Sequence, residues 1–182
     1  MINGQEPPQL LKQKLLYQGR KFAFEVARLR LPNRAEIDGE CIRHPGGALA
    51  IPVTPDGQLV LTKQYRFAAC GRLLEFPAGT VEPHEDPATT IQREIQEEVG
   101  YRAQRWQTLG TFLLAPGYSD EKIYAFLAQD LEKLEVPLAQ DLDEDIDVVH
   151  MTVAEVEQAI FEGQLVDAKS IASFFLARPL LS

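Results

Sequence analysis

Apolar and polar residues alternate along the first part of the chain, and a period of two is typical of half-buried β-strands. Residues 14–31 (KLLYQGRKFAFEVARLRL) alternate on both sides of a Gln18-Gly19 turn signal, which predicts a β-hairpin. The prolines and weak periodicity of residues 1–10 predict a loosely ordered lead into this hairpin. Residues 33–39 are expected to form a loop.

A second alternating region predicts another hairpin. The apolar stretches GGALAIPV and QLVLTKQYRF flank residues 54–57, which read Thr-Pro-Asp-Gly. Pro55 and Gly57 stand at the second and fourth positions of these four residues, where a type I turn favours proline and glycine.

The period lengthens to that of a helix after Asp86. Three apolar residues recur at every fourth position: Ile91, Ile95 and Val99. Such a stripe anchors a helix to a core. Asp86 suits the N-cap, Pro87 suits the first helical position, and Gly100 suits a left-handed residue after the helix end.

The remaining pattern predicts three strands followed by two helices that are separated by Gly163. The strands are expected at residues 107–114, 122–127 and 146–152, and the helices at residues 153–162 and 168–178. Strands on both sides of one helix, with helices at the end, indicate an α+β or α/β sandwich.

Three carboxylates lie on one edge of the predicted helix, next to its apolar stripe. Glu94, Glu97 and Glu98 would repel one another there, unless a cation lies among them. Mg²⁺ is the simplest candidate, because it prefers carboxylate ligands and often shares them with substrate phosphates. The alternative is a solvated acidic helix.

The order of residues around this edge resembles the complete Nudix box, which marks hydrolases of nucleoside diphosphates linked to another moiety. The matching residues are Gly79, Glu85, Arg93, Glu94, Ile95, Glu97, Glu98 and Gly100. Thr90 and Ile91 stand where many members have alanines, and Tyr101 closes the box where an aliphatic residue is commoner. None of these departures changes a carboxylate.

The resemblance implies a Nudix fold, in which a mixed β-sheet lies between helices and follows a small N-terminal antiparallel sheet. Residues 1–45 are then expected to form an N-terminal hairpin and dimerisation region, and residues 46–182 the Nudix hydrolase domain. Because a two-stranded hairpin is marginal alone, we expect it to pack on a second subunit in a homodimer.

The same resemblance implies which residues bind the metal. Glu94 and Glu98 are the expected principal Mg²⁺ ligands, and Glu97 is a further or bridging ligand counted also as catalytic. The backbone carbonyl of Ala78 is expected to complete the site, and Mn²⁺ is the alternative ion. Gly79 and Gly100 are expected to be structural.

Two charged residues of the box and one acidic loop leave alternatives open. Glu85 and Arg93 either take part in metal binding or form a salt bridge that holds the loop against the helix. In relatives that cleave ADP-ribose, the catalytic base comes from an acidic loop near the C-terminus. Residues 141–145 match that place, and Glu144 is the expected base; the alternative is a solvated charged loop.

Two further segments, LEFPAG at residues 74–79 and APGYSDE at residues 115–121, resemble the ADP-ribose pyrophosphatase branch. Pro116 matches the proline of that branch, whereas Tyr118 lies near a tyrosine of dinucleoside polyphosphate hydrolases. The expected substrate-binding residues are Arg66, Glu75, Pro116, Gly117, Glu121 and Phe24. Tyr17 and Phe22 are further candidates for an adenine clamp, with burial in a core as the alternative for all three aromatic residues.

Composition narrows the class of protein. The 182 residues suffice for one well-packed domain, and a formal charge of −9 argues against binding to nucleic acid or anionic membranes. Cys41 and Cys70 lack metal-site spacing and are expected to be reduced thiols. The start MINGQEPPQL has no signal pattern, so a soluble, cytoplasmic protein is expected.

The resemblance therefore implies Mg²⁺-dependent hydrolysis of ADP-ribose to AMP and ribose 5-phosphate by attack of water on phosphorus. A second interpretation keeps the metal and the diphosphate but changes the attached group, as in GDP-mannose, another sugar nucleotide or a dinucleoside polyphosphate. A third is a non-catalytic ADP-ribose sensor. The intact box and the acidic net charge disfavour that third interpretation.

Overall fold

The computed structural model describes residues 6–135 and 145–181. The chain forms two compact units. The first comprises Met1–Pro45 and Leu113–Lys122, and the second comprises Gly46–Phe112 and Ile123–Ser182.

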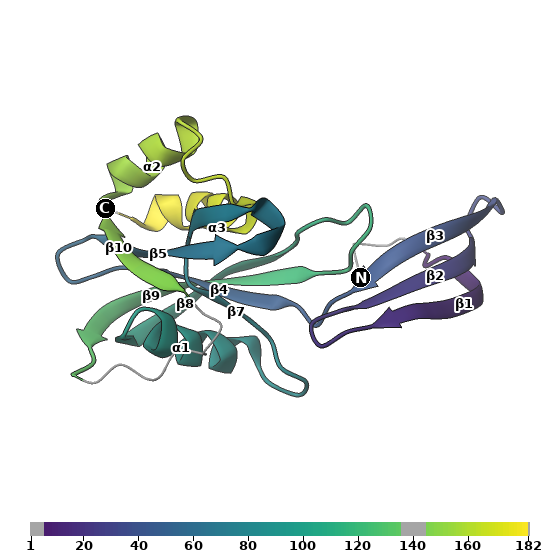
Figure 1. Ribbon diagram of the computed structural model, residues 1–182, viewed down its shortest axis with the longest axis horizontal. Helices are drawn as coiled ribbons and strands as arrows, with labels where there is room; N and C mark the ends of the chain where they lie inside the picture. Colours follow the sequence, from purple (N-terminus) through teal and green to yellow (C-terminus); the bar gives the residue numbers. More distant parts are fainter. Residues whose placement is uncertain (1–5, 136–144, 182) are drawn as a thin grey trace. The chain divides into compact units, whose positions relative to one another are not determined.

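The first unit contains a three-stranded antiparallel sheet in the order β1-β2-β3 (Figure 1). Its strands are β1 (Gln9–Gln18), β2 (Ala23–Arg30) and β3 (Glu36–Arg43). The predicted hairpin around Gln18 and Gly19 is confirmed, because β1 pairs with β2 from Gln9↔Arg30 to Gln18↔Ala23. The first strand begins inside the stretch that was expected to be loosely ordered.

The prediction of a loop at residues 33–39 is wrong. The turn is shorter and closes with a hydrogen bond from the Leu31 amide to the Ala35 carbonyl (2.8 Å), with Arg34 at a φ of 70°. Strand β3 then begins at Glu36. Charged residues alternate with Ile37, Gly39 and Cys41 in this strand, so its apolar content is too low to indicate a strand without the partner β2.

The second unit contains two sheets (Figure 1). The four-stranded sheet has the order β7-β4-β9-β8, with β7 (Ala78–Thr80), β4 (Gly47–Pro52), β9 (Lys122–Lys133) and β8 (Tyr101–Leu113). It is mixed, because β4 runs parallel to β9 and antiparallel to β7. The three-stranded sheet has the order β10-β5-β6, with β10 (Ile146–Met151), β5 (Leu59–Arg66) and β6 (Gly71–Glu75).

The prediction that the strands around residues 54–57 pair as a hairpin is wrong, although the turn itself forms. The Gly57 amide donates to the Thr54 carbonyl (2.9 Å), and Gly57 has a φ of +83°, which glycine tolerates best. Strands β4 and β5 nevertheless belong to different sheets, and an isolated bridge between Val53 and Leu59 joins their ends. The turn redirects the chain from one sheet to the other.

Three α-helices belong to the second unit: α1 (Pro87–Glu98), α2 (Val153–Phe161) and α3 (Ala168–Ala177). The predicted caps of α1 are confirmed, since Asp86 accepts a hydrogen bond from the Ala88 amide (2.8 Å) and Gly100 has a φ of 70°. Thr152 and Glu155 form a capping box at the start of α2. Short 3₁₀ turns occupy Phe67–Ala69 and Arg178–Leu180.

The helices cover both faces of the strands in the second unit (Figure 1). The apolar stripe of α1 is buried in a cluster that includes Ala48 and Ala50 of β4. On α3, Phe174 stacks with Phe76 at 6.5 Å between ring centroids. The predicted fold class, a mixed sheet between helices with an N-terminal antiparallel sheet, is therefore confirmed. No helix within the described residues has the length and apolarity needed to cross a bilayer.

Candidate active site

The carboxylates of α1 are mostly buried, not solvated. Glu94 is 9% exposed and Glu98 is 4% exposed, whereas Glu97 is half-buried. Buried carboxylates require charged or hydrogen-bonding partners, because desolvation of an unpaired charge costs several kcal/mol, on the order of the stability of a small domain. The partners come from β7 and from Arg93.

Gly79 in β7 lets the backbone approach Glu94. A Cβ atom at position 79 would lie 2.1 Å from Oε1 of Glu94, so the Glu94 side chain would have to shift to admit it. The close approach of a carboxylate therefore favours glycine here, although its backbone does not lie in the left-handed region. This contact gives the predicted structural role of Gly79 a steric basis.

Glu98 is attached to the same strand. Its Oε2 accepts a hydrogen bond from the Ala78 amide at 3.1 Å. Ala78 and Gly79 pair antiparallel with Leu49 and Ala48 of β4, so the sheet fixes the backbone that meets both glutamates. The sequence-predicted residues Ala78, Glu94 and Glu98 are thus brought together.

Arg93 forms ion pairs with two carboxylates of the same helix, Glu94 and Glu97. Its Nη1 lies 2.8 Å from Oε2 of Glu97 and 3.0 Å from Oε1 of Glu94. Its Nη2 lies 3.7 Å from Oε2 of Glu85, and the same Glu85 oxygen accepts a hydrogen bond from Thr90 Oγ1 (2.7 Å). The structure thus contains the ion pair that was one of two alternatives for Glu85 and Arg93.

Electrostatics at this guanidinium follow from its neighbours. Burial disfavours the charge of Arg93, but the negative charges of Glu94 and Glu97 outweigh this effect and raise the pKa of Arg93. Two carboxylates therefore already share one positive charge on this edge of α1.

The carboxylates suit a divalent cation by their chemistry, although their present arrangement serves other partners. Within residues 6–135 and 145–181, no three His, Cys, Asp or Glu side chains are placed to hold a metal ion together. The reason is local: Arg93 lies between Glu94 and Glu97, while Glu98 bonds to the Ala78 amide. Carboxylate oxygens on one helix edge are nevertheless the ligand chemistry that a hard cation prefers.

A second charged group lies where β5, β6 and α3 meet. Glu75 is 2% exposed, and it accepts hydrogen bonds from Nε (2.9 Å) and Nη2 (2.7 Å) of Arg66. Lys169 Nζ lies 2.7 Å from Oε2 of the same carboxylate. Burial alone would raise the pKa of Glu75, but Arg66 and Lys169 overcome this effect and lower it.

Arg66 keeps a partly exposed side chain, at 35%, although two of its nitrogens are bound to Glu75. The hydrogen bonds that Arg66 donates to Glu75 raise the pKa of Arg66, and the negative charge of Glu98 adds to the effect. A fixed guanidinium near the α1 carboxylates suits the binding of an anionic group.

The other sequence-predicted residues lie elsewhere. Glu144 is outside the described residues. Pro116, Gly117 and Glu121 belong to the loop between β8 and β9 in the first unit, where the Ser119 amide donates to the Ala115 carbonyl (2.9 Å). Also in the first unit, Nδ1 of His44 lies 3.6 Å from Oε1 of Glu121.

The aromatic candidates for an adenine clamp also lie in the first unit. Phe24 is half-buried, while Tyr17 and Phe22 are exposed and lie 6.0 Å apart between ring centroids. Burial in a core, the alternative interpretation, is therefore wrong for Tyr17 and Phe22.

Sequence reasoning assigned no site role to Lys169 or Ser170. Ser170 Oγ accepts a hydrogen bond from the Phe76 amide (2.9 Å), next to Glu75. The detectable signal was the capping residue Asp167, which accepts from the Ser170 amide (3.0 Å) and so fixes the first turn of α3. Nothing in the sequence around Asp167 indicated that this turn contacts Glu75.

Comparisons with known proteins agree with this architecture. The family model described as NUDIX domain matches residues 43–174. A Bacillus methanolicus protein named methanol dehydrogenase activator is 34% identical over 161 residues, which cover 88% of this chain and 87% of that protein. The ADP-ribose pyrophosphatase of Bacillus subtilis (strain 168) is 31% identical over 160 residues, covering 88% and 86%.

A solved structure shares the fold. The crystal structure of ADP compounds hydrolase superposes with a TM-score of 0.83 and covers 98% of this chain and 96% of that one. The two sequences are 24% identical, so the likeness is one of architecture.

Proposed function

This chain belongs to the NUDIX domain family and is a Nudix hydrolase, and from that premise we propose that it cleaves the diphosphate bond of ADP-ribose. Hydrolysis would depend on Mg²⁺ and give AMP and ribose 5-phosphate. The observation that carries the proposal is the meeting of Glu94 and Glu98 with β7, where Gly79 leaves room for a carboxylate. A relative named ADP-ribose pyrophosphatase supports the choice of substrate.

The residues proposed to hold the metal are Glu94, Glu97 and Glu98, with the Ala78 carbonyl. Nudix hydrolases generally need a divalent metal; Mg²⁺ is proposed here and Mn²⁺ is the alternative. When bound, such an ion neutralises phosphate charge and lowers the pKa of a bound water. Without the metal, Arg93 lies between the carboxylates of Glu94 and Glu97 and offsets their mutual repulsion.

Arg66 is proposed to bind the diphosphate. Its guanidinium is held by two hydrogen bonds to Glu75 and is partly exposed, so it can donate to an anion with little loss of side-chain freedom. Its charge offsets the local excess of carboxylates, which would otherwise repel an anionic substrate. Pro116, Gly117, Glu121 and Phe24 stay proposed substrate contacts.

Glu144 is proposed as the general base that takes a proton from the attacking water. The residue that follows it, Asp145, is an ion-pair partner of Arg72 in β6. Arg72 Nη2 also lies 2.7 Å from Oδ2 of Asp147 in β10. These contacts anchor the start of β10, which supports a defined position for the chain just beyond the proposed base.

One assay tests the proposed reaction. The protein is incubated with ADP-ribose, GDP-mannose, NADH and diadenosine polyphosphates in ¹⁸O water with Mg²⁺, and the product masses are measured by mass spectrometry. We expect ADP-ribose to turn over fastest and one product phosphate to carry the label. A chelator should stop the reaction, and added Mg²⁺ should restore it. A folded protein that leaves ADP-ribose intact with either Mg²⁺ or Mn²⁺ contradicts the proposal.

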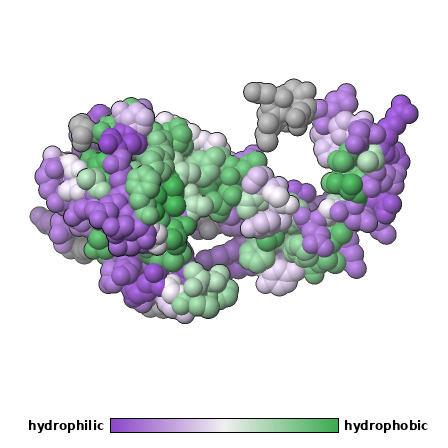
Figure 2. Space-filling model, turned by 90° about the horizontal axis from the view of Figure 1, so that it is seen from above, coloured by the Kyte–Doolittle hydropathy of each residue, from purple (hydrophilic) through white to green (hydrophobic). Residues whose placement is uncertain are grey.

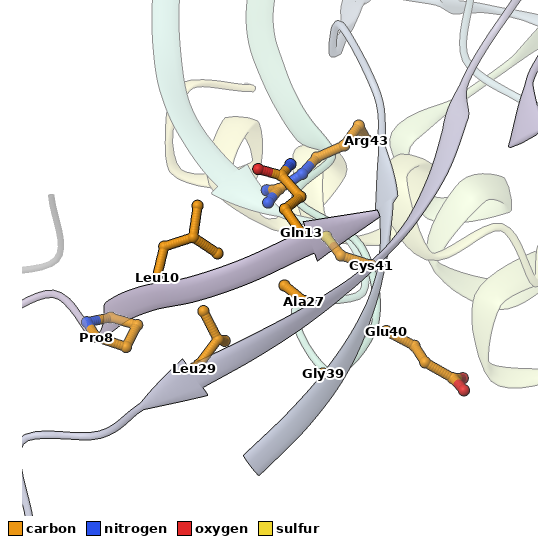
Figure 3. A pocket seen from close by; sticks show the side chains of 9 residues that line it. All are labelled: Pro8, Leu10, Gln13, Ala27, Leu29, Gly39, Glu40, Cys41 and Arg43. Atoms are coloured by element: carbon orange, nitrogen blue, oxygen red, sulfur yellow. The ribbon is translucent and has the colours of Figure 1, made fainter. Parts of the chain in front are cut away.

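We also propose a homodimer that forms through the first unit. Large apolar side chains are exposed on its sheet, and Figure 2 shows hydrophobic residues on this surface among hydrophilic ones. Figure 3 shows a pocket on the same sheet, lined by Leu10 of β1 and Leu29 of β2. Its volume is about 370 Å³. A second copy of the chain would bury this apolar surface.

A cytoplasmic location stays a prediction. It rests on the two cysteines, Cys41 and Cys70, which are both free thiols.

A further inference from the structure

Four charged side chains of alternating sign form a chain of contacts in the second unit. Arg66 binds Glu75 through two nitrogens, and Glu75 binds Lys169 through Oε2. Lys169 Nζ then lies 3.0 Å from Oδ2 of Asp167. The residues come from β5, β6 and α3, so the contacts link three elements.

Lys169 is not an ordinary surface lysine. Its side chain and that of Asp167 are each 15% exposed, and the carboxylate of Glu75 is 2% exposed. A buried lysine that meets two carboxylates costs desolvation energy that a surface lysine avoids. Packing alone does not explain it, because an apolar side chain of equal length would fill the same space without that cost.

The first turn of α3 holds Lys169 in place. Asp167 accepts a hydrogen bond from the Ser170 amide, and Ser170 Oγ accepts one from the Phe76 amide. Since Phe76 directly follows Glu75, helix α3 is tied to the backbone on which the carboxylate stands. Lys169 and Glu75 therefore meet in a single geometry.

The Glu75 carboxylate connects Lys169 to Arg66 through shared hydrogen bonds. A carboxylate bonded to Arg66 alone would form a neutral pair, which attracts an anion weakly. Because Oε2 accepts from both Arg66 and Lys169, its negative charge is divided between two cations. Asp167 in turn offsets the charge of Lys169, so the four charges balance and the contacts act by holding the Glu75 carboxylate in place; the partly exposed cation of the group is Arg66.

We infer that Lys169 is a positioning residue for the diphosphate: through Glu75, it orients the guanidinium that Arg66 presents to the substrate. This inference rests on the proposed function, because it assigns Arg66 the role of binding the substrate diphosphate. Lys169 itself makes no contact with substrate in this account.

The first test separates binding from turnover. Lys169→Met removes the charge with little change in length, and we expect a KM for ADP-ribose about 10-fold higher, with kcat within about 2-fold of wild type. Lys169→Arg should restore KM, because it keeps a cation at Glu75. Lys133→Met, at an exposed position in β9, changes the net charge equally and should leave KM unchanged. An unaltered KM in Lys169→Met, or a fall in kcat alone, overturns the inference.

The second test asks whether Lys169 acts through Arg66. In an Arg66→Ala background, Lys169→Met should raise KM by less than about 2-fold, because the group it positions is gone. Equal effects of Lys169→Met in both backgrounds overturn the inference. If Lys169→Met does not fold, Lys169→Gln replaces it, since it donates a hydrogen bond without a charge; a wild-type KM in Lys169→Gln is then the contrary result.

Two measurements together separate the role of Lys169 from the proposed function: titration calorimetry with ADP-ribose in the absence of metal reports binding, and the assay with Mg²⁺ reports hydrolysis. A wild-type protein that binds and hydrolyses ADP-ribose, with Lys169→Met binding equally well, refutes the role of Lys169 and leaves the proposed function standing. A folded wild-type protein that neither binds nor hydrolyses ADP-ribose refutes both.

Discussion

At the scale of single residues, the contact between Gly79 and Glu94 places a proposed metal ligand against the backbone of β7. A missing side chain in β7 lets a buried carboxylate lie against the backbone, and the neighbouring Ala78 amide holds Glu98. Both glutamates are therefore held next to the backbone of β7. The box residues act as a steric and hydrogen-bonded unit.

Replacing Gly79 with alanine tests this contact. The new Cβ would overlap the Glu94 carboxylate, so we expect Gly79→Ala to lower the free energy of unfolding by about 1–3 kcal/mol and to reduce turnover. Urea denaturation and initial rates measure the two effects. Gly71→Ala is the matched control, because a Cβ there meets no atom closer than the Ala69 carbonyl oxygen at 3.8 Å. Wild-type stability and rate in Gly79→Ala would refute the steric argument.

The sequence alone predicted a large part of this neighbourhood. Spacing placed the glutamates on one helix edge, and the caps of α1 followed from Asp86, Pro87 and Gly100. It did not predict that Glu75 meets Lys169, because these residues are 94 positions apart and only tertiary packing brings them together. The four-residue spacing of Arg93 and Glu97 did allow the ion pair that the structure contains, but it did not indicate the further contact of Arg93 with Glu94.

Elements of the second unit are joined by buried polar contacts as well as by apolar packing. Helix α3 reaches β6 through Ser170 and Lys169, and β6 reaches β5 through Glu75 and Arg66. Sequence reasoning predicted these helices and strands more reliably than their partners. The Thr54–Gly57 turn has the expected local geometry, but sheet membership depends on distant strands, so β4 pairs with β9 and β5 pairs with β10.

The ionisation of Glu75, which links β5, β6 and α3, should make the free energy of unfolding depend on pH. Its pKa is lowered in the folded protein, so its charged form stabilises the fold above its ordinary pKa of 4.5. That stabilisation should disappear as pH falls through the lowered value. We therefore expect the stability difference between wild type and Glu75→Gln to shrink as urea unfolding is repeated from neutral pH to well below 4.5.

Glu135→Gln provides the control for this pH series, because Glu135 is exposed. It should differ little from wild type at neutral pH. A stability difference between wild type and Glu75→Gln that stays constant across the series would show that the carboxylate charge does not hold β5, β6 and α3 together.

At the scale of the whole molecule, the first unit exposes much of its sheet to solvent. Its strand β1 is exposed along its entire length, and a three-stranded sheet needs a covered apolar face to be stable. The acidic net charge of −9 keeps such chains apart unless apolar contact outweighs the repulsion. We propose that a second copy of this chain buries the exposed face of the sheet β1-β2-β3.

Sedimentation equilibrium tests the dimer. We expect a mass of about twice the chain mass of 20.4 kDa. Leu10→Glu should shift the mass toward a single chain, because Leu10 lines the apolar pocket and is 53% exposed. Leu180→Glu, at an exposed position of the second unit, should leave the mass unchanged. A single-chain mass for wild type at every concentration would exclude the dimer.

In the proposed reaction, the carboxylate edge of α1 holds a divalent cation that makes diphosphate hydrolysis possible. The most direct measurement is the initial rate of ADP-ribose hydrolysis as Mg²⁺ is raised to saturation, in wild type and Glu98→Gln, with circular dichroism as the test of folding. Glu98→Gln removes a ligand charge at nearly constant shape, so we expect a fall in rate of at least about 10-fold that added Mg²⁺ does not reverse. A folded Glu98→Gln protein with a near wild-type rate at saturating Mg²⁺ would contradict the claim.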